Sequence, residues 1–229
     1  MKEKLLCLRE LPLFQGLSEA EFNTICPGKI NKSVAKGDFL FRQGEYDPTI
    51  YLIKSGKLKL IQNNEDGREI IISIVGSGQV LGESALFQES ELQFSAVALE
   101  DAKLCGFNRQ GLEMIIQQNP DFAIKIINHL AWKLNTTMQQ VSESSAGSVR
   151  EKLLRLLIRF ANEYGKTISD MVIIELNITQ QDMANMIGAS RVKVAQVLKE
   201  FRSAGILSRH GRYYMLKTDF CVKNSGILG

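Results

Sequence analysis

The side chains with the clearest chemical purpose are cations gathered towards the C-terminus. Between residues 190 and 217 the chain carries seven Lys and Arg residues and a single acidic residue, Glu200. Residues 148–229 hold 13 Lys and Arg against 7 Asp and Glu, whereas residues 1–147 hold 15 against 18. A basic segment joined to an acidic one is typical of a nucleic-acid-binding module attached to a second module.

The sequence offers few residues suited to metal binding or catalysis. The four cysteines (Cys7, Cys26, Cys105 and Cys221) form no CxxC pair, and two histidines are too few to complete a zinc site. We therefore expect reduced, partly buried thiols and no metal site. The chain shows no Walker loop, no nucleophile elbow and no paired carboxylates near a histidine, which argues against an enzyme.

Two short helices are predicted to position the basic side chains. Thr179 and Asp182 form a capping box at the start of the first helix, Gly188 ends it, and Ser190 caps the second. This is a helix-turn-helix pattern, in which the outer, N-terminal face of the second helix meets base edges and phosphates. The predicted inner face of the second helix is Val194, Val197, Leu198 and Phe201. A basic β-hairpin with its turn at 209–212 follows as a wing. The expected DNA-binding residues are Thr179, Gln180, Gln181, Ser190, Arg191, Val192, Lys193, Gln196 and His210.

The part of the chain before the helix-turn-helix is predicted to form two further structures. From Gly37 to about Phe107, short β-branched and aromatic segments alternate with glycine turns, which predicts a small barrel or roll. The expected strands are 39–41, 50–53, 58–60, 69–75, 96–99 and 104–107. A long helix is then expected from Asn119, its cap, to about Glu143. Apolar side chains at heptad spacing favour a two-fold coiled coil there, although a helix packed on its own domain is the alternative. The predicted dimer interface is Ile127, Leu130, Leu134, Thr137 and Val141.

The remaining predictions concern the hinge and the location of the protein in the cell. Ser142–Ser148 is rich in Ser and Gly, and it precedes an amphipathic helix over Val149–Tyr164 with Gly165 as its C-cap. Apolar residues make up 45% of the chain and charged residues 23%, as in ordinary globular proteins. No apolar run approaches the roughly 20 residues that span a bilayer, and the N-terminus does not read as a signal peptide. These features predict a cytoplasmic protein with no membrane partner.

Over nearly its whole length the chain resembles the family of the cyclic AMP receptor protein and the fumarate-nitrate reduction regulator (CRP/FNR). The resemblance rests on the glycine-spaced roll, Leu81-Gly82-Glu83, Asn119-Pro120-Asp121, and Thr179 to Leu207. It implies an α+β fold: an N-terminal β-roll of the cyclic-nucleotide-binding, jelly-roll type, a long dimerisation helix and a C-terminal winged helix-turn-helix. The expected domains are an effector-sensing roll (1–118), a dimerisation helix with hinge (119–147) and a DNA-binding domain (148–229).

The resemblance also implies a pocket for a small effector inside the roll, but this chain departs from the cyclic AMP pattern. The family holds the ribose with a Gly-Glu pair and the cyclic phosphate with an Arg-Ser pair. Here Phe94 occupies the Arg position, and Met138 replaces a Ser on the long helix. A phenyl ring cannot neutralise a phosphate as a bidentate Arg does. We therefore expect an effector other than cyclic AMP and more apolar than it. The expected pocket residues are Gly82, Glu83, Ser84, Phe94, Ser95, Thr137 and Met138.

Two other sensing chemistries found in the family are not supported. An iron-sulfur cluster needs closely spaced N-terminal cysteines, whereas Cys7 and Cys26 lie 19 residues apart. A haem ligand would have to be His129, which lies off the heptad seam, or His210, in the wing. A redox switch at Cys105 is disfavoured, because reactivity requires exposure and a lowered pKa. No cofactor is therefore assigned.

The family's base-reading positions map to Arg191, Val192 and Gln196. Arg suits guanine, Gln suits adenine, and the methyl groups of Val suit the thymine methyl group. The expected partner is an inverted-repeat operator with half-sites richer in A·T than the TGTGA typical of the cyclic AMP receptor. The preferred interpretation is a homodimer that regulates transcription in response to an effector, with RNA polymerase as a further partner. The alternative is a regulatory nucleotide-binding module that acts on a protein partner without specific DNA binding.

Overall fold

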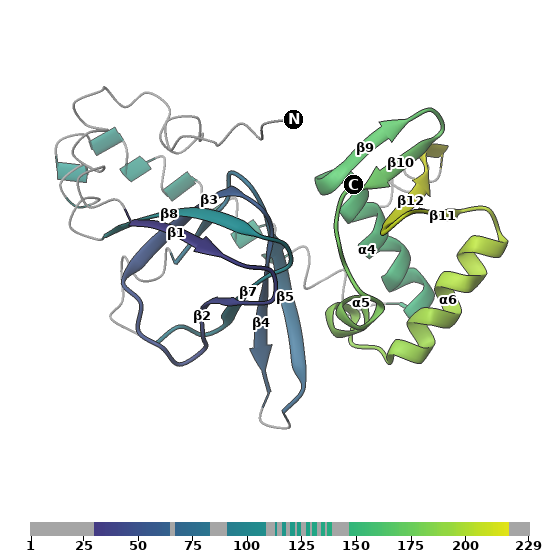
Figure 1. Cartoon of the computed structure of the whole chain (residues 1–229), viewed down its shortest axis with the longest axis horizontal. Coiled ribbons are helices and arrows are strands. Elements are labelled where there is room, and N and C mark those ends of the chain that lie inside the picture. The colour runs from purple at the N-terminus through teal and green to yellow at the C-terminus, as the bar shows by residue number, and fades with distance from the viewer. Residues whose placement is uncertain are drawn as a thin grey trace. The chain divides into compact units, whose positions relative to one another are not determined.

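The computed structural model describes residues 30–64, 67–82, 91–108 and 147–219, together with some residues between 113 and 138. The chain divides into two compact units, residues 1–137 and 138–229. The first is built mainly from β-strands, and the second mixes helices with a small sheet (Figure 1).

The first unit is a roll of two antiparallel sheets. One sheet has the strand order β1-β8-β3-β6 and the other β2-β7-β4-β5. The strands are β1 (Ile30–Val34), β2 (Phe39–Phe41), β3 (Thr49–Ser55), β4 (Leu58–Asn63), β5 (Glu69–Val75), β6 (Val80–Leu81), β7 (Ser95–Ala98) and β8 (Ala102–Asn108). The sequence predicted the centres of β2, β3, β4, β5, β7 and β8, and it missed β1 and β6.

The roll is stabilised by side chains that both sheets direct inwards. Strand β4 alternates in the expected way, with Leu58 and Leu60 buried and Lys59 half-buried between them. Strand β7 is buried at all four of its residues. One apolar cluster spans both sheets: Val34, Leu40, Phe41, Tyr51, Ile53, Leu58, Leu60, Val75, Leu81, Leu92, Ala96, Ala98, Ala102 and Leu104.

Between the roll and the second unit, the described residues from 113 to 138 are all helical. The predicted cap Asn119, and Val141 at the end of the seam, lie outside the described residues. Several apolar side chains on this segment are exposed in the single chain: Ile124 (57%), Ile127 (62%), Leu134 (57%) and Met138 (61%). Within the described residues, no helix combines the length and apolar character required to cross a lipid bilayer.

The second unit is a helix-turn-helix supported by one helix and a four-stranded antiparallel sheet of order β11-β12-β10-β9. Its elements are α4 (Val149–Tyr164), β9 (Gly165–Ile168), β10 (Met171–Ile174), α5 (Gln180–Ile187), α6 (Arg191–Ser203), β11 (Leu207–His210) and β12 (Tyr213–Lys217). Helix α4 has the predicted bounds, and, as expected for an amphipathic helix, one apolar face is buried, including Leu153, Leu156, Leu157 and Phe160. The α+β class and the winged helix-turn-helix are therefore confirmed.

Two local details differ from the prediction. Gly165 is the C-cap of α4, but its backbone is extended (φ −88°, ψ 145°) because the chain enters β9 directly. Glycine is needed because a Cβ there would collide with the Ala161 carbonyl oxygen. In the wing, Arg209 and His210 belong to β11, so the turn contains only Gly211 and Arg212.

Candidate nucleic-acid interface and effector pocket

The turn between α5 and α6 fixes the direction of the second helix. Gly188 adopts the left-handed conformation (φ 64°, ψ 38°), and its N–H donates to the Ala184 carbonyl. Ala184 has no exposed surface, which suits a small side chain between two packed helices. At the other end of α5, Thr179 and Asp182 form the predicted capping box.

Helix α6 has one buried and one exposed face. Its predicted inner residues Val194, Val197, Leu198 and Phe201 are at most 2% exposed. On the opposite face Arg191, Val192, Lys193 and Gln196 are all exposed. Val192 is 79% exposed, although exposure of an apolar side chain to water is unfavourable. The helix therefore presents cationic, apolar and amide groups together on a face that the described residues of its unit leave exposed.

The charges at the start of α6 are opposite to those of the other two helices. Glu151 in α4 and Asp182 in α5 close capping boxes, and their negative charges suit the positive end of the helix dipole. The first turn of α6 contains no acidic residue; it carries Arg191 and Lys193. Cations at this end are unfavourable in the free protein and become favourable when an anion such as a phosphate approaches.

Two predicted contact residues at this helix end have donors available. Within the part of the chain that the structure describes, no hydrogen bond or ion pair engages the Arg191 guanidinium. The Ser190 hydroxyl oxygen accepts the Lys193 N–H at 3.2 Å, which leaves its own proton free to donate. Both groups can thus donate hydrogen bonds to a base edge or a phosphate.

The predicted contact residues at the start of α5 are more engaged in hydrogen bonds within their own helix. Thr179 donates both its N–H (3.0 Å) and its hydroxyl (2.6 Å) to the Asp182 carboxylate. Gln180 is half-buried, and the Gln181 side-chain amide donates to Asn185 Oδ1 at 2.8 Å. In this arrangement Thr179 secures the helix end, and the exposed Gln181 is better placed to meet a phosphate.

The wing carries two arginine–tyrosine pairs that the sequence reasoning missed. Arg209 lies directly opposite Tyr214 across the hairpin; its guanidinium sits 4.6 Å from the ring centroid and donates to the hydroxyl at 3.0 Å. At the tip, Arg212 lies 5.0 Å from the Tyr213 ring and donates to its hydroxyl at 2.8 Å. The cross-strand register of a two-residue hairpin could have revealed the first pair. His210, the predicted wing contact, is exposed beside this tip.

Helix α6 contains a second arrangement that the sequence reasoning missed. Lys193 Nζ donates to Gln196 Oε1 at 3.3 Å, and Gln196 Nε2 donates to Glu200 Oε1 at 3.2 Å. The residues are three and four positions apart, which is the spacing at which side chains meet on one helix face. Gln196 thus lies between a cation and an anion.

The predicted effector pocket is described only in part. Phe94 is half-buried, packs against the roll core and tilts against Phe41, with ring centroids 5.9 Å apart. Beside it in sequence, Ser95 is 5% exposed, and its Oγ accepts the Gln43 N–H at 2.9 Å. Tyr51 also stacks on Phe41, with ring centroids 6.4 Å apart, so the position that would face a cyclic phosphate is surrounded by aromatic rings.

Of the other five predicted pocket residues, the structure describes three. Gly82 follows β6, with its backbone so near the Thr49 carbonyl that no side chain would fit. Glu83 and Ser84 lie outside the described residues. Thr137 and Met138 are helical and exposed.

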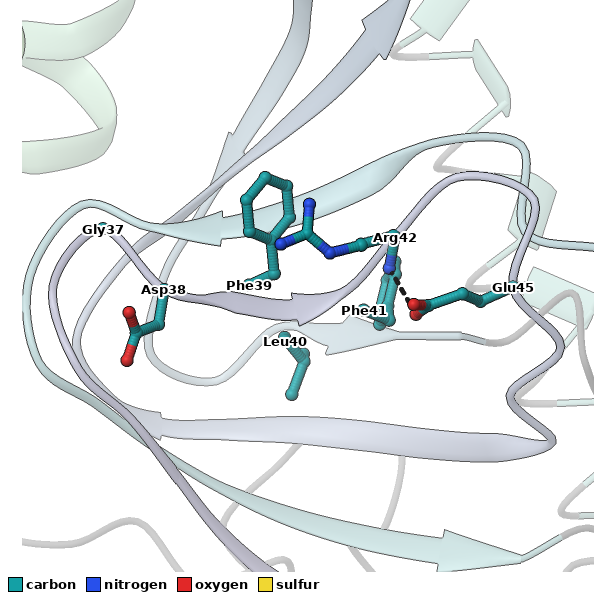
Figure 2. A pocket seen from close by; sticks show the side chains of 7 residues that line it. All are labelled: Gly37, Asp38, Phe39, Leu40, Phe41, Arg42 and Glu45. Carbon is teal, nitrogen blue, oxygen red and sulfur yellow. Dashed lines mark hydrogen bonds between the residues drawn. The ribbon is translucent and has the colours of Figure 1, made fainter.

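A shallow, open depression of about 570 Å³ lies over strand β2 (Figure 2). The Arg42 guanidinium covers the Phe39 ring at 3.6 Å, and the Arg42 N–H donates to the Glu45 carboxylate at 2.8 Å. None of the predicted pocket residues lines this depression; its lining is Gly37, Asp38, Phe39, Leu40, Phe41, Arg42 and Glu45. Because it is open and its cation already rests on a ring, we do not assign the effector to it.

The described residues offer little for metal or thiol chemistry. No group of three His, Cys, Asp or Glu side chains among them could hold a metal ion. The thiol of Cys105, in strand β8, has no exposed surface. Burial of this kind makes a thiol unreactive. Cys7, Cys26 and Cys221 lie outside the described residues.

Two family models match the chain, one in each unit. A model described as a cyclic nucleotide-binding domain matches residues 31–119, and a Crp-like helix-turn-helix domain matches residues 151–219. The first match includes the roll, and the second includes α4, the helix-turn-helix and the wing.

Proteins that are similar in sequence or in fold support the same family. The anaerobic regulatory protein of Bacillus subtilis is 28% identical over 192 residues, covering 82% of this chain and 81% of that protein. The cAMP-activated global transcriptional regulator CRP of Pasteurella multocida is 27% identical over 174 residues, covering 76% and 83%. The fold matches that of the c-di-GMP responsive global regulator CLP of Xanthomonas campestris, with a TM-score of 0.74 at 22% identity, covering 87% of this chain and 99% of that one. With a family model matched in each unit and relatives that span most of its length, the chain belongs to the CRP/FNR family of transcription regulators.

Proposed function

We propose that this protein is a homodimeric, effector-responsive regulator that binds an inverted-repeat DNA operator through α6 and the wing. The observation that carries the proposal is the exposed face of α6. Arg191 and Lys193 stand where the helix dipole favours an anion, and Val192 and Gln196 supply an apolar and an amide group for base edges. DNA is the polyanion that offers all three kinds of contact in one groove.

The predicted half-site follows from these side chains. Arg191 binds O6 and N7 of one guanine, Val192 packs against a thymine methyl group, and Gln196 pairs with N6 and N7 of an adenine. Ser190, Lys193 and His210 contact phosphates and carry no sequence information. The wing adds the Arg212 charge beside His210.

Selection of binding sites from random duplex DNA tests this function. We expect an inverted repeat with one conserved G·C pair in each half-site and A·T-rich neighbouring positions. Recovery of intact TGTGA half-sites would contradict the roles given to Val192 and Gln196. Weak retention of all sequences alike would instead favour the alternative, a regulatory module that acts on a protein partner.

The proposed dimer forms through the long helix. The exposed residues Ile127 and Leu134 belong to the predicted seam. Ile124 lies three residues before Ile127 and Met138 four residues after Leu134, which are heptad spacings. Leu130 is half-buried and Thr137 exposed. In a two-fold dimer the same stripe from each copy would cover the other and remove this apolar surface from water.

The proposed effector is a small molecule held in the roll, and it is not cyclic AMP. Support comes from Phe94, whose ring packs on Phe41 at the position where the family has a phosphate-binding Arg. Calorimetry with cyclic AMP at micromolar concentration is expected to show no saturable binding. Tight binding coupled to a gain in DNA affinity would contradict this assignment.

The remaining parts of the proposal concern organisation and setting. We assign residues 1–118 to effector sensing, 119–147 to dimerisation and the hinge, and 148–229 to DNA binding. Such a regulator would act on chromosomal DNA in the cytoplasm, with RNA polymerase as its further partner, and would catalyse no reaction. Mass spectrometry of material retained by the purified protein would identify the effector.

A further inference from the structure

An acidic side chain on the DNA-facing surface of a recognition helix is repelled by the DNA phosphates. Glu200 is nevertheless exposed on α6, and it is the only acidic residue between 190 and 217. Its carboxylate accepts a hydrogen bond from Gln196 Nε2 at 3.2 Å, one helical turn away. This contact suggests a function for the carboxylate that offsets its repulsion of DNA.

The contacts of Gln196 fix which way its amide group points. The oxygen faces the Lys193 ammonium at 3.3 Å, and the nitrogen faces the Glu200 carboxylate. An amide turned by 180° would place its N–H groups against the ammonium and its oxygen against the carboxylate. Both of those contacts are repulsive, so a single orientation is favoured.

The same contacts leave Gln196 able to read a base. Its amide oxygen can accept two hydrogen bonds and its nitrogen can donate two, and the contacts within the helix use one of each. The remaining acceptor and donor match N6–H and N7 of adenine, the pair of contacts by which Gln recognises that base. Gln196 can therefore meet adenine without breaking its contact to Glu200.

DNA binding should affect the two neighbours of Gln196 in opposite ways. Phosphates attract the Lys193 ammonium, which can leave Gln196 for the backbone, as expected of a phosphate contact. Phosphates repel Glu200, so its carboxylate has no competing partner on the DNA backbone and stays on Gln196. Of the two neighbours, Glu200 is thus the one that remains to hold the amide in the complex.

We propose that Glu200 is a positioning residue for specificity: it holds the Gln196 amide in the orientation that reads adenine and lowers affinity for all DNA in exchange. This inference rests on the proposed function, because it requires that Gln196 reads a base. It predicts an unusual pair of effects, in which loss of Glu200 raises general affinity and lowers discrimination at one base pair.

Full-length wild-type protein and the variants Glu200→Ala, Glu200→Gln, Gln196→Ala and Gln196→Ala/Glu200→Ala are compared on the selected operator. Affinities are measured for all four base pairs at the position where Gln196→Ala loses its preference. For Glu200→Ala we expect discrimination at this position to fall about fivefold, a partial loss of one bidentate contact. Discrimination at the Arg191 position should not change, and affinity for unrelated DNA should rise. Glu200→Gln keeps an acceptor oxygen and should keep the discrimination.

The double variant separates positioning from a general effect. In the Gln196→Ala background, Glu200→Ala should cause no further loss of discrimination, because no amide remains to be oriented. Unchanged discrimination in Glu200→Ala, or an equal loss in both backgrounds, would overturn the inference and leave the proposed function standing. A wild-type protein with no preferred sequence would overturn the proposed function, and the inference with it.

Discussion

Arg191 and Lys193 lie two residues apart at the start of the same helix, yet they are expected to act differently on DNA. Arg191→Ala should cost about 1–3 kcal/mol of binding free energy and relax the preference at one G·C pair. Lys193→Ala should weaken binding to every sequence alike and reduce the slope of log K against log salt by about 1. Gel shifts at several salt concentrations, on the selected operator and on unrelated DNA, measure both quantities. Equal relaxation at one base pair in both variants would contradict the separate roles.

At the wing, the tyrosine beside Arg212 provides a test of how the cation is held. Arg212→Ala removes the charge and should lower the salt slope by about 1. Tyr213→Phe keeps the charge and the ring but removes the hydroxyl that accepts from Arg212. It should therefore weaken DNA binding by only about 0.5–1 kcal/mol, the worth of an exposed hydrogen bond, with the salt slope unchanged. Loss of slope in Tyr213→Phe would show that the hydroxyl has another role.

Among the elements, strand β3 contains a tyrosine whose ionisation couples to the stability of the roll. Burial first, and then the hydrogen bond to Asp47 and its negative charge, raise the pKa of Tyr51 to about 12. Below pH 10.0 both folded and unfolded chains keep the phenol proton. Between pH 10.0 and about 12 the unfolded chain releases it while the folded chain retains it, so the free energy of unfolding falls as pH rises.

Tyr51→Phe should change this pH dependence in a defined direction. Near neutral pH the variant should be less stable by about 1 kcal/mol, because the bond to Asp47 is lost. Approaching pH 12, wild type should lose on the order of 2 kcal/mol that the variant keeps. Urea unfolding at about pH 8 and about pH 11.5 measures the difference. Tyr46→Phe, at a tyrosine that is 58% exposed, is the matched control. A pH-independent difference would contradict the coupling.

The elements that the sequence predicted best are those with local signals. The bounds of α4, the cap of α5 and the left-handed Gly188 follow from helix-end chemistry within a few residues. Strand β1 was missed because its first four residues are exposed and show no alternation, so that only its pairing with β8 identifies it. Predicted and observed turns in the wing differ because Arg209 is held in β11 by Tyr214 across the hairpin, a contact outside its own segment.

The candidate site likewise combines features that local sequence predicts with contacts that it does not predict. The inner and outer faces of α6 follow from helical periodicity, so the exposure of Arg191 and Gln196 was predictable. The bond from Gln196 to Glu200 has the right spacing, but spacing alone does not show which of several possible partners a long side chain selects. The contact between Phe94 and Phe41 joins β2 to the segment before β7, far apart in sequence, and only the packed roll reveals it.

For the whole molecule, the central prediction is that the long helix pairs with its copy. Leu134→Glu would place an uncompensated charge in the proposed seam, at a cost of about 3–5 kcal/mol of dimerisation free energy. Sedimentation equilibrium should then report monomers at concentrations where wild type is dimeric. Asn128→Glu adds the same charge at another exposed position of this helix and should remain dimeric. A dimeric Leu134→Glu would show that the interface lies elsewhere.

The capping box that starts α4 bears on how the DNA-binding domain can be exchanged between proteins during evolution. The Ser148 hydroxyl accepts from the Glu151 N–H at 3.3 Å, and Glu151 Oε2 accepts from the Ser148 N–H at 2.8 Å. Both partners lie at the front of the DNA-binding segment, so the segment itself supplies the cap of its first helix. Evolution could therefore transfer residues 148–229 as a cassette behind a different sensor. A chimera joined at Gly147 to another dimerising helix should keep the wild-type half-site preference.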